Sequence, residues 1–461
     1  MAPYYEDETP LGRYSARLRP AAVAPEVERR QRLVARAAQR VADRAFGADP
    51  AVSVEAADCR AVNIVDHHQV LNHPLLLGTN IISNASRLLA GDRRRPIVTF
   101  SCANVTPSNA YMRNGFRFRG RGVPYFSARE SHDAMYLAAV RPFDFVERLQ
   151  AMGRWVEFEP ADRDFLVDHQ AFLNHLDYSH CAGHRDQLAV VVRATWPLLF
   201  DCSVRAAVPD LLYLNAEEVT RDCLVELLSG DSFVGATLLE PGLRAQVVER
   251  FRGVTVAWDE AAGKGTHFFW RRYPGRPRLL RLYLDGDALV PSDARFRDLA
   301  VPMERNALLD HLAADEIVPS VALGVTVFLS AGIRPLVGPG SLVYITALRD
   351  GWTSLLTANG FGADAELVAS VDTSGLIAGT PMFFERDGAR LRALHAADVF
   401  AAGGVDREYL DAVLGAPLCD VLSVGAGGVY DLFAGTYIPP DRQLAYRIGF
   451  DDAATVVHRW V

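Results

Sequence analysis

Two short, apolar, β-branched runs, each followed at once by a polar loop, constrain the fold of this chain more than any other feature. The first run covers residues 61–65 (AVNIV) and the second covers residues 97–101 (IVTFS). A helical pattern over residues 81–90 separates them. This order of strand, polar loop, helix, strand and polar loop is typical of a doubly wound parallel sheet. We therefore predict an α/β fold whose core is a Rossmann-like doubly wound parallel sheet with helical insertions.

Apolar periodicity predicts further elements around this unit. Residues 25–46 begin with acidic side chains and carry one apolar face, which indicates an amphipathic surface helix. The other predicted elements are strands at 187–192 and 211–214, a hairpin over 278–289 that turns at Asp285-Gly286, an apolar helix over 315–329 that is broken or begins near Pro319, a loop over 332–340 and a helix over 341–356. We divide the chain into an N-terminal helical segment (1–60), a catalytic core (61–358) and a small mixed C-terminal domain (359–461).

Composition limits the classes of partner. The chain of 461 residues has 48 basic and 56 acidic side chains, whereas a general nucleic-acid binder needs a basic excess. Its six cysteines include no C-x-x-C pair, so neither a disulfide framework nor a Cys-only zinc site is indicated. No apolar run of about eighteen residues and no signal-peptide core is present. We expect a cytoplasmic protein that acts on small molecules, without nucleic acid or membrane as a partner, and a homodimer is one candidate assembly.

The strongest candidate site is the loop after the first predicted strand. It holds three imidazoles and one carboxylate within eight residues, in the set Asp66, His67, His68, Asn72 and His73. Imidazole serves as acid or base near neutral pH, and doubly wound sheets bind ligands at the carboxyl ends of their strands. We predict His67, His68 and His73 as catalytic residues, and the binding set also includes Thr79 and Asn80. The alternative is that one or more of these histidines caps the next helix or bonds a backbone carbonyl.

The loop after the second predicted strand is a second candidate site. It offers amides and hydroxyls suited to a phosphate, a ribose or a carboxylate, in the set Asn104, Thr106, Ser108 and Asn109. The same residue types also favour an ordinary polar turn, and this interpretation stays open.

A third candidate is the Gly-Pro-Gly bend that enters a helix near residue 340. The amides of Gly338 and Gly340 at a helix N-terminus attract anions, with Tyr344 one turn further on and Arg334 upstream. The alternative is a turn followed by an N-cap at Ser341. Lys264 lies in a glycine-flanked loop that is suited to closing over a phosphate, or is simply exposed.

A metal site is the less favoured interpretation of the histidines. His180 and His184 are four positions apart and would share one face of a helix, so they are the alternative metal ligands. A polar helix end is the other interpretation. Neither H-E-x-x-H nor a Cys/His finger spacing occurs, and no metal site is predicted.

Three segments resemble the cysteine-adding enzymes of bacillithiol biosynthesis. Residues 65–75 resemble that family's threonine-glycine-glutamine-glutamine loop, which leads through glycine-proline-leucine into a long helix. Residues 268–289 resemble its phenylalanine-containing strand and hairpin, and residues 315–351 resemble its proline-bearing helix and the glycine-proline loop before a tyrosine helix. The chain departs from the family at His67 and His68, which stand where glycine and glutamine are expected. The acidic-histidine motif and the C-terminal coiled coil of the family are also missing.

The resemblance implies a Rossmann-like, nucleotide-binding core related in plan to class I aminoacyl-tRNA synthetases. It also implies amide formation between an amine and an amino acid. Because an altered loop stands on a shared scaffold, we expect related chemistry on another amine or acid, with ATP or ADP as the candidate nucleotide. The alternatives are a metal-dependent hydrolase or lyase that uses the histidine cluster, and a non-catalytic binding or scaffold protein. Each of these proposed catalytic functions requires that the loop near residue 70 and the bend near residue 339 face each other across one cleft.

Overall fold

A parallel sheet lies at the centre of the computed structural model, which describes residues 6–19, 22–67, 73–109, 111–373, 379–387, 390–426 and 440–442. The sheet has four strands, and all of its pairings are parallel. Its order is β13-β1-β2-β5, with β1 at Ala61–His67, β2 at Ile97–Cys102, β5 at Leu211–Asn215 and β13 at Arg334–Leu336. The prediction of an α/β fold with a parallel sheet is confirmed, and the two β-branched runs are neighbouring strands.

Helices cover both faces of this sheet, which explains why its strands are apolar throughout. All residues of β2 and β5 are buried, as expected for parallel strands between two helical layers. One face packs against α2, α9, α13 and α14. The other packs against α1, α3, α4, α7 and the C-terminal helices α16 and α17. Their bounds are α1 Leu11–Leu18, α2 Pro25–Phe46, α3 Pro74–Ile82, α4 Ala85–Ala90, α7 His184–Thr195, α9 Ala216–Ser229, α13 Val321–Ser330, α14 Pro339–Ala358, α16 Ala396–Ala401 and α17 Arg407–Gly415.

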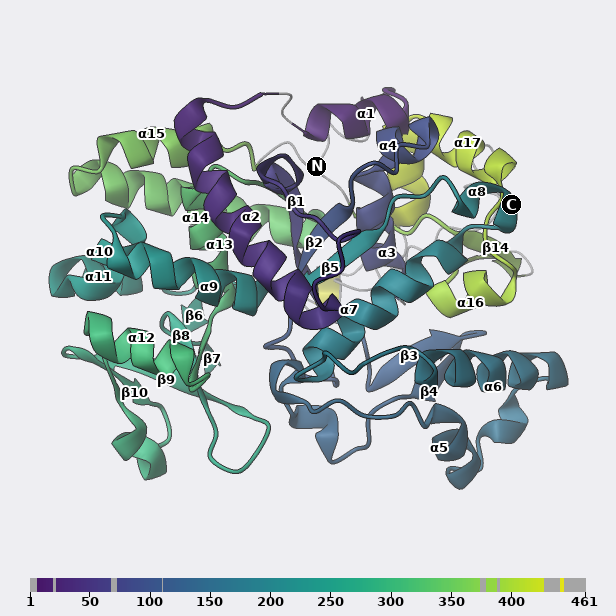
Figure 1. The fold of residues 1–461 in the computed structure, drawn as a ribbon, viewed down its shortest axis with the longest axis horizontal. Helices are drawn as coiled ribbons and strands as arrows, with labels where there is room; N and C mark the ends of the chain where they lie inside the picture. The colour runs from purple at the N-terminus through teal and green to yellow at the C-terminus, as the bar shows by residue number, and fades with distance from the viewer. Residues whose placement is uncertain are drawn as a thin grey trace.

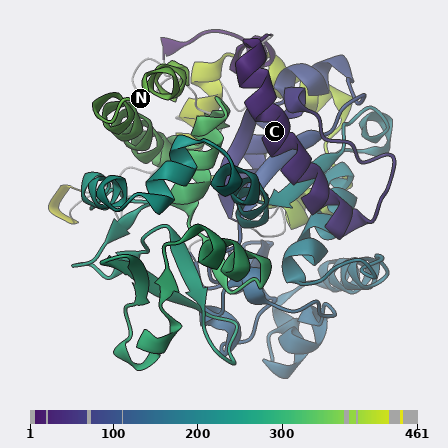
Figure 2. The same ribbon diagram turned by 60° about the vertical axis from the view of Figure 1, so that its left-hand side comes forward.

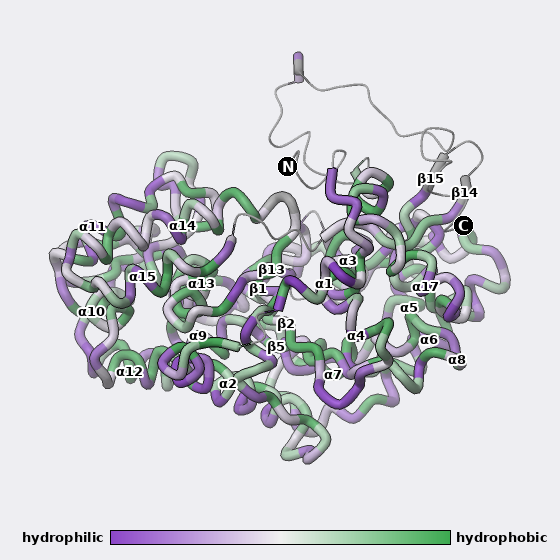
Figure 3. Tube along the Cα trace, turned by 90° about the horizontal axis from the view of Figure 1, so that it is seen from above, coloured by the Kyte–Doolittle hydropathy of each residue, from purple (hydrophilic) through white to green (hydrophobic). Residues whose placement is uncertain are grey.

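The order of the strands creates a switch point beside β1. From β1 the chain adds β2 and then β5 on one side, and later returns to add β13 on the other side of β1. Figure 3 shows β13, β1, β2 and β5 side by side in this order. Open α/β sheets bind ligands outside the carboxyl ends of their strands at such a reversal. Here the reversal lies between His67 at the end of β1 and Gly338 just after β13.

Two lobes adjoin the central sheet, one blue and one green in Figures 1 and 2. The blue lobe follows β2 and contains β3 Gly115–Phe118, β4 Arg121–Pro124, α5 Phe145–Ala151 and α6 Pro160–Asn174. The green lobe contains a five-stranded sheet in the order β11-β10-β9-β8-β12. Its elements are α10 Phe233–Leu239, α11 Pro241–Arg250, β6 Trp258–Asp259, β7 Lys264–Gly265, β8 Phe269–Arg272, β9 Leu279–Asp285, β10 Ala288–Pro291, β11 Val301–Pro302, α12 Arg305–Ala313 and β12 Ile317–Pro319.

Several predicted elements agree with the structure. The helix over 25–46 is α2, the strand at 211–214 lies within β5, and the predicted hairpin is β9–β10. The helix over 341–356 lies within α14, whereas the predicted helix over 81–90 is divided into the end of α3 and α4. The remaining elements are α8 Cys202–Arg205, α15 Gly362–Ser370, β14 Phe384–Asp387 and β15 Arg390–Ala393.

Two predicted elements are wrong. Residues 187–192 belong to helix α7, because a short apolar run fits a buried helix as well as a strand. The predicted loop over 332–340 contains the three-residue strand β13, whose Pro335 is tolerated because β13 is an edge strand. The apolar helix over 315–329, predicted to break or begin near Pro319, begins at Val321, and residues 317–319 before it form strand β12. The divisions at residues 60 and 358 stay predictions.

The C-terminal segment 379–380 packs against α3 and the bend after β13. A Cβ added at Gly78 of α3 would lie only 1.6 Å from the carbonyl oxygen of Thr380. A Cβ added at Gly379 would lie 2.6 Å from Thr79 Oγ1 and 3.0 Å from Gly338 Cα. The space between α3 and Gly338 is therefore occupied in part by the main chain of this segment.

This contact predicts that Gly78→Ala destabilises the protein. Its methyl group would have to displace the main chain of Thr380, and such overpacking should lower the free energy of unfolding by about 2 kcal/mol. Gly242→Ala in α11 is the matched control, since no atom lies within 4 Å of its added Cβ, and it should change stability by less than ~1 kcal/mol. Urea denaturation of the two variants measures the difference. Equal stabilities would contradict the close packing of Gly78.

Candidate functional site

The carboxyl ends of the parallel strands gather the main sequence-predicted residues at one edge of the sheet. His67 ends β1 and is paired with Cys102 of β2, and Asn104 follows β2 directly. On the other side of β1, Asn63 is paired with Leu336, and the chain then turns at Gly338 into α14. The loop after β1 and the bend after β13 therefore begin from adjacent strands. The main chain of residues 379–380 lies between α3 and Gly338, close to both.

A β-bulge in β1 brings two polar residues onto the same face of the sheet. Asn63 is paired with Thr99 and Asp66 with Ser101, so β1 has one more residue than β2 over this stretch. Asn80 of α3 connects the two. Its Nδ2 donates to Asp66 Oδ2 at 3.3 Å, and its Oδ1 accepts from Asn63 Nδ2 at 3.4 Å and from Thr99 Oγ1 at 2.7 Å. A buried polar network thus lies between α3 and the sheet.

Asp66 is the least satisfied member of this network. Its side chain is 1% exposed, and its Oδ1 has no hydrogen-bond partner among the residues of the described ranges. Burial raises the pKa of Asp66 to about 7, against the opposing effect of the hydrogen bonds from Asn63 and Asn80. The carboxyl group can therefore gain and lose a proton near neutral pH, which is the behaviour expected of a group at an active site.

His67 is held as a neutral imidazole. Burial lowers its pKa to about 4, and a hydrogen bond with Asn109 opposes this shift. Its Nδ1 is buried and finds no hydrogen-bond partner in the described part of the chain. The ring meets the Tyr111 ring edge-on with 4.6 Å between centroids. A neutral imidazole with a vacant nitrogen is able to accept a proton.

His73 has a structural role that the sequence analysis left open. Its Nδ1 accepts a hydrogen bond from the backbone N–H of Leu75 at 3.2 Å and so caps α3. Its ring lies 4.9 Å from Tyr111 and 5.8 Å from His395, measured between centroids. Burial, and next the positive charge of His395, lower the pKa of His73 to about 3. His68 and Asn72 lie outside the described residues.

Glu217 holds the loop after β2 in place, and sequence reasoning missed it. Its buried carboxylate accepts hydrogen bonds from the backbone N–H groups of Ala103 and Asn104, each at 3.0 Å, and from Asn215 Nδ2 at 2.8 Å. The signal available in the sequence was Asn215 as an N-cap followed by acidic residues in the first turn of a helix.

The polar residues of the loop after β2 mostly stabilise the loop itself. Asn109 Oδ1 accepts from the backbone N–H groups of Tyr111 and Met112, and its Nδ2 donates to the carbonyl of Thr106 at 2.7 Å. Thr106 Oγ1 and Ser108 Oγ are hydrogen-bonded to each other at 3.0 Å. The polar-turn interpretation therefore describes this loop, although Asn109 also reaches His67.

Other predicted binding residues occupy different surroundings. Arg334 begins β13 at the end opposite Gly338, and its guanidinium donates to the carbonyls of Arg17 and Leu18. Lys264 is exposed on β7 in the green lobe. Thr79 Oγ1 donates to the carbonyl of Leu75 inside α3. Gly340 belongs to α14, where the Tyr344 hydroxyl donates to Ser341 Oγ at 2.6 Å.

The alternative metal pair is not assembled. His184 begins α7, whereas His180 precedes that helix and lies against Gly47, so the two do not share a helix face as predicted. Both ring nitrogens of His184 are occupied, Nδ1 by Gln187 Oε1 at 2.8 Å and Nε2 by the Tyr125 hydroxyl at 3.3 Å. Over the described ranges, no group of three or more His, Cys, Asp or Glu side chains is placed to hold a metal ion.

Comparisons with models of protein families, with curated proteins and with solved structures find no match for this chain. In the part of the chain that the structure describes, no helix has both the length and the apolar character needed to span a membrane.

Proposed function

We propose that this protein is an enzyme of small-molecule biosynthesis that forms a C–N bond between an amine and a carboxylic acid. The observation that carries the proposal is the buried, unpartnered Nδ1 of His67 at the switch point of the parallel sheet, among the described residues. A neutral imidazole at this position is suited to accept the proton that an amine loses when it attacks an acyl group. The resemblance to the bacillithiol cysteine-adding enzymes supports the same class of reaction.

We also propose that the sheet is a Rossmann-like core with a nucleotide site at its carboxyl edge. The parallel order β13-β1-β2-β5 and its reversal at β1 support this proposal. The first turn of α14 supports it too, because the helix dipole favours a phosphate at this N-terminus. In this scheme ATP activates the acid. The carboxylate attacks the α-phosphorus of ATP, which gives an acyl adenylate and releases pyrophosphate. The amine nitrogen then bonds to the acyl carbon, the bond between that carbon and the phosphate oxygen breaks so that AMP leaves, and the amine proton passes to His67.

Asp66 has a different task in this scheme. Because its pKa is raised to about 7, it is present both as the acid and as the carboxylate at neutral pH. The protonated form donates a hydrogen bond and the ionised form attracts a cationic amine, so Asp66 is suited to hold the amine before it reacts. Asn80 positions this carboxyl group through Nδ2.

The proposal predicts an ATP-dependent product that His67→Asn no longer forms. ATP, ADP and AMP are each tested for a rise in melting temperature, which a ligand of the native state must cause. The protein is then incubated with ATP and mixed amines and amino acids, and amides are detected by mass spectrometry. His67→Asn should slow product formation by at least ~100-fold, the usual contribution of a general base, without lowering the melting temperature.

His132→Asn, an exposed histidine of the blue lobe, is the matched control and should keep full activity. The absence of any nucleotide-induced shift and of any product would refute the proposal. Stoichiometric zinc or iron that is lost on His67→Ala would instead favour the hydrolase or lyase.

A further inference from the structure

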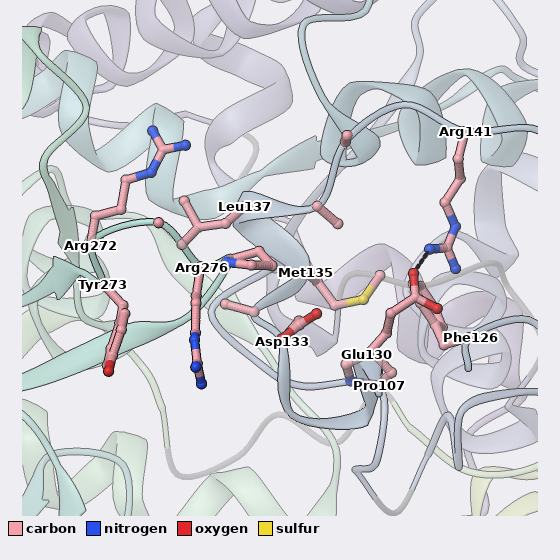
Figure 4. Close-up of a pocket in the computed structure, with 15 residues that line it drawn as sticks. Pro107, Phe126, Glu130, Asp133, Met135, Leu137, Arg141, Arg272, Tyr273 and Arg276 are labelled. Carbon is pink, nitrogen blue, oxygen red and sulfur yellow. Dashed lines mark hydrogen bonds and ion pairs between the residues drawn. The ribbon is translucent and has the colours of Figure 1, made fainter. Parts of the chain in front are cut away.

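A pocket of about 530 Å³ lies between the blue and green lobes. Its buried floor comes from the blue lobe and the loop after β2 and is formed by Pro107, Phe126, Ala134 and Met135. Its other wall is the turn between β8 and β9, which carries Arg272, Tyr273 and Arg276 (Figure 4). This volume lies in the range of pockets that hold small organic ligands.

The carboxylates that line this pocket are already paired. Glu130 is bonded to Arg141, which also lies over the ring of Phe126 at 4.3 Å. Asp133 is paired with Arg278 at 3.3 Å. Arg141 and Arg278 thus neutralise these two carboxylates, and neither carboxylate is paired with Arg272 or Arg276.

Arg272 and Arg276 are less committed to ion pairs than Arg141 and Arg278 are. Arg276 is exposed, and its guanidinium lies over the Tyr273 ring, 5.8 Å from the ring centroid. The nearest carboxylate to Arg272 is Asp315, at 3.9 Å, and this carboxylate already accepts a hydrogen bond from the Tyr136 hydroxyl at 2.8 Å. The two arginines leave the turn in different directions (Figure 4), so positive charge extends along one side of the apolar floor. Such a side can pair with an anionic group of a ligand.

We infer that this pocket binds an organic acid with an apolar body, whose carboxylate faces Arg276 or Arg272 and whose body covers Met135 and Pro107. The inference rests on the proposed function, for which it identifies the acid substrate by its chemistry. The apolar floor favours an acid with a hydrocarbon body over a compact oxyanion such as phosphate, because the body gains by leaving water.

The pocket is connected to the edge of the parallel sheet through main-chain hydrogen bonds. The N–H of Tyr136 donates to the carbonyl of Ala103 at 2.7 Å, and the N–H of Met135 donates to the carbonyl of Val105 at 3.0 Å. The loop that begins at the end of β2 thus also forms the floor of the pocket. This continuity places the acid-binding pocket on the same loop that Glu217 holds at the candidate active site.

Ligand-observed NMR titration tests the inference with three probes. These are 3-phenylpropionate, its uncharged amide and inorganic phosphate. We expect saturable binding of 3-phenylpropionate that is about tenfold tighter than that of the amide, as one charge-assisted hydrogen bond implies, and no saturable binding of phosphate. Equal affinity for acid and amide, stronger binding of phosphate, or no binding of the acid would overturn the inference.

Variants locate the bound acid. Arg276→Gln combined with Arg272→Gln should weaken 3-phenylpropionate about tenfold, and Ala139→Trp, at an exposed lining position, should abolish its binding by filling the pocket. Arg295→Gln is the matched control, because Arg295 is exposed in the same lobe and is paired with Asp293 outside the pocket. Unchanged affinity in the first two variants would place the acid elsewhere and refute the inference.

The two proposals fail in different ways. If no acid binds but His67→Asn still abolishes ATP-dependent product formation, only the pocket assignment falls. If 3-phenylpropionate binds as expected but no nucleotide raises the melting temperature and no amide forms, the ligase proposal falls and the pocket remains as an acid-binding site.

Discussion

Glu217→Ala is expected to lower the free energy of unfolding by about 4 kcal/mol. The carboxylate is 3% exposed and accepts hydrogen bonds from two backbone N–H groups and from the Asn215 amide. Alanine would leave these donors without an acceptor inside the protein, and each buried unsatisfied donor costs about 1–3 kcal/mol. Loss of these hydrogen bonds should also make the loop after β2, which begins at Ala103, more mobile.

Two variants separate this effect from a general loss of charge. Glu217→Gln keeps the shape of the side chain but has one accepting oxygen, so its stability should fall between wild type and Glu217→Ala. Glu226→Ala removes a half-exposed glutamate of the same helix that pairs with Arg36, and should cost less than ~1 kcal/mol. Urea denaturation gives the stabilities, and hydrogen exchange at Ala103 and Asn104 reports the loop. A cost for Glu217→Ala no greater than that for Glu226→Ala would show that this carboxylate does not hold the loop.

Asp66→Asn should have the opposite effect and should stabilise the protein at alkaline pH. Burial raises the pKa of Asp66 from 3.8 to about 7, so the folded state binds this proton more tightly than the unfolded state does. The folded protein therefore loses stability as the pH rises above 3.8, and the loss is complete above about 7. At ~1.4 kcal/mol for each pH unit, the full cost is ~4 kcal/mol. Asparagine carries no such cost because it does not ionise.

The pH dependence distinguishes this explanation from a simple packing effect. Asp66→Asn should be more stable than wild type by less than ~2 kcal/mol at pH 5 and by ~4 kcal/mol at pH 8. Asp298→Asn, at an exposed position in the green lobe, is the control and should show no such growth with pH. A difference that stays constant between pH 5 and pH 8 would mean that Asp66 does not titrate as a buried acid.

The two carboxylates show how function and stability compete at this edge of the sheet. Burial raises the pKa of both, but Glu217 has donors for both oxygens, whereas Asp66 has an oxygen with no partner in the described ranges. A buried acid that destabilises its own protein is typical of an active site, where a ligand supplies the missing partner. We therefore expect Asp66→Asn to be more stable and less active in the assay proposed for His67.

The sequence alone was sufficient for the elements whose signals are local. Helix α2 and strands β1 and β2 follow from apolar periodicity, and the β9–β10 hairpin follows from its Asp-Gly turn, because neighbouring residues decide these conformations. The same patterns predicted polar loops with His67 and Asn104 after two strands, and a bend at Gly338 before a helix. The parallel pairing of β1 with β2 and β13 brings these three positions to one edge.

What the tertiary structure decided depends on residues far apart in the chain. The identity of α7 as a helix, the short strand β13 and the segment at Gly379 are set by packing partners that no local pattern contains. The chemical properties of the candidate site residues also depend on the tertiary structure. The sequence does not distinguish the roles of His67 and His73, yet only His73 accepts a hydrogen bond at Nδ1 from a helix N-terminus. The carboxyl groups of Asp66 and Glu217 likewise differ in the hydrogen-bond donors that the fold brings to them. Burial and hydrogen bonding determine whether such a group stabilises the fold or is left to act on a ligand, and both are properties of the assembled structure.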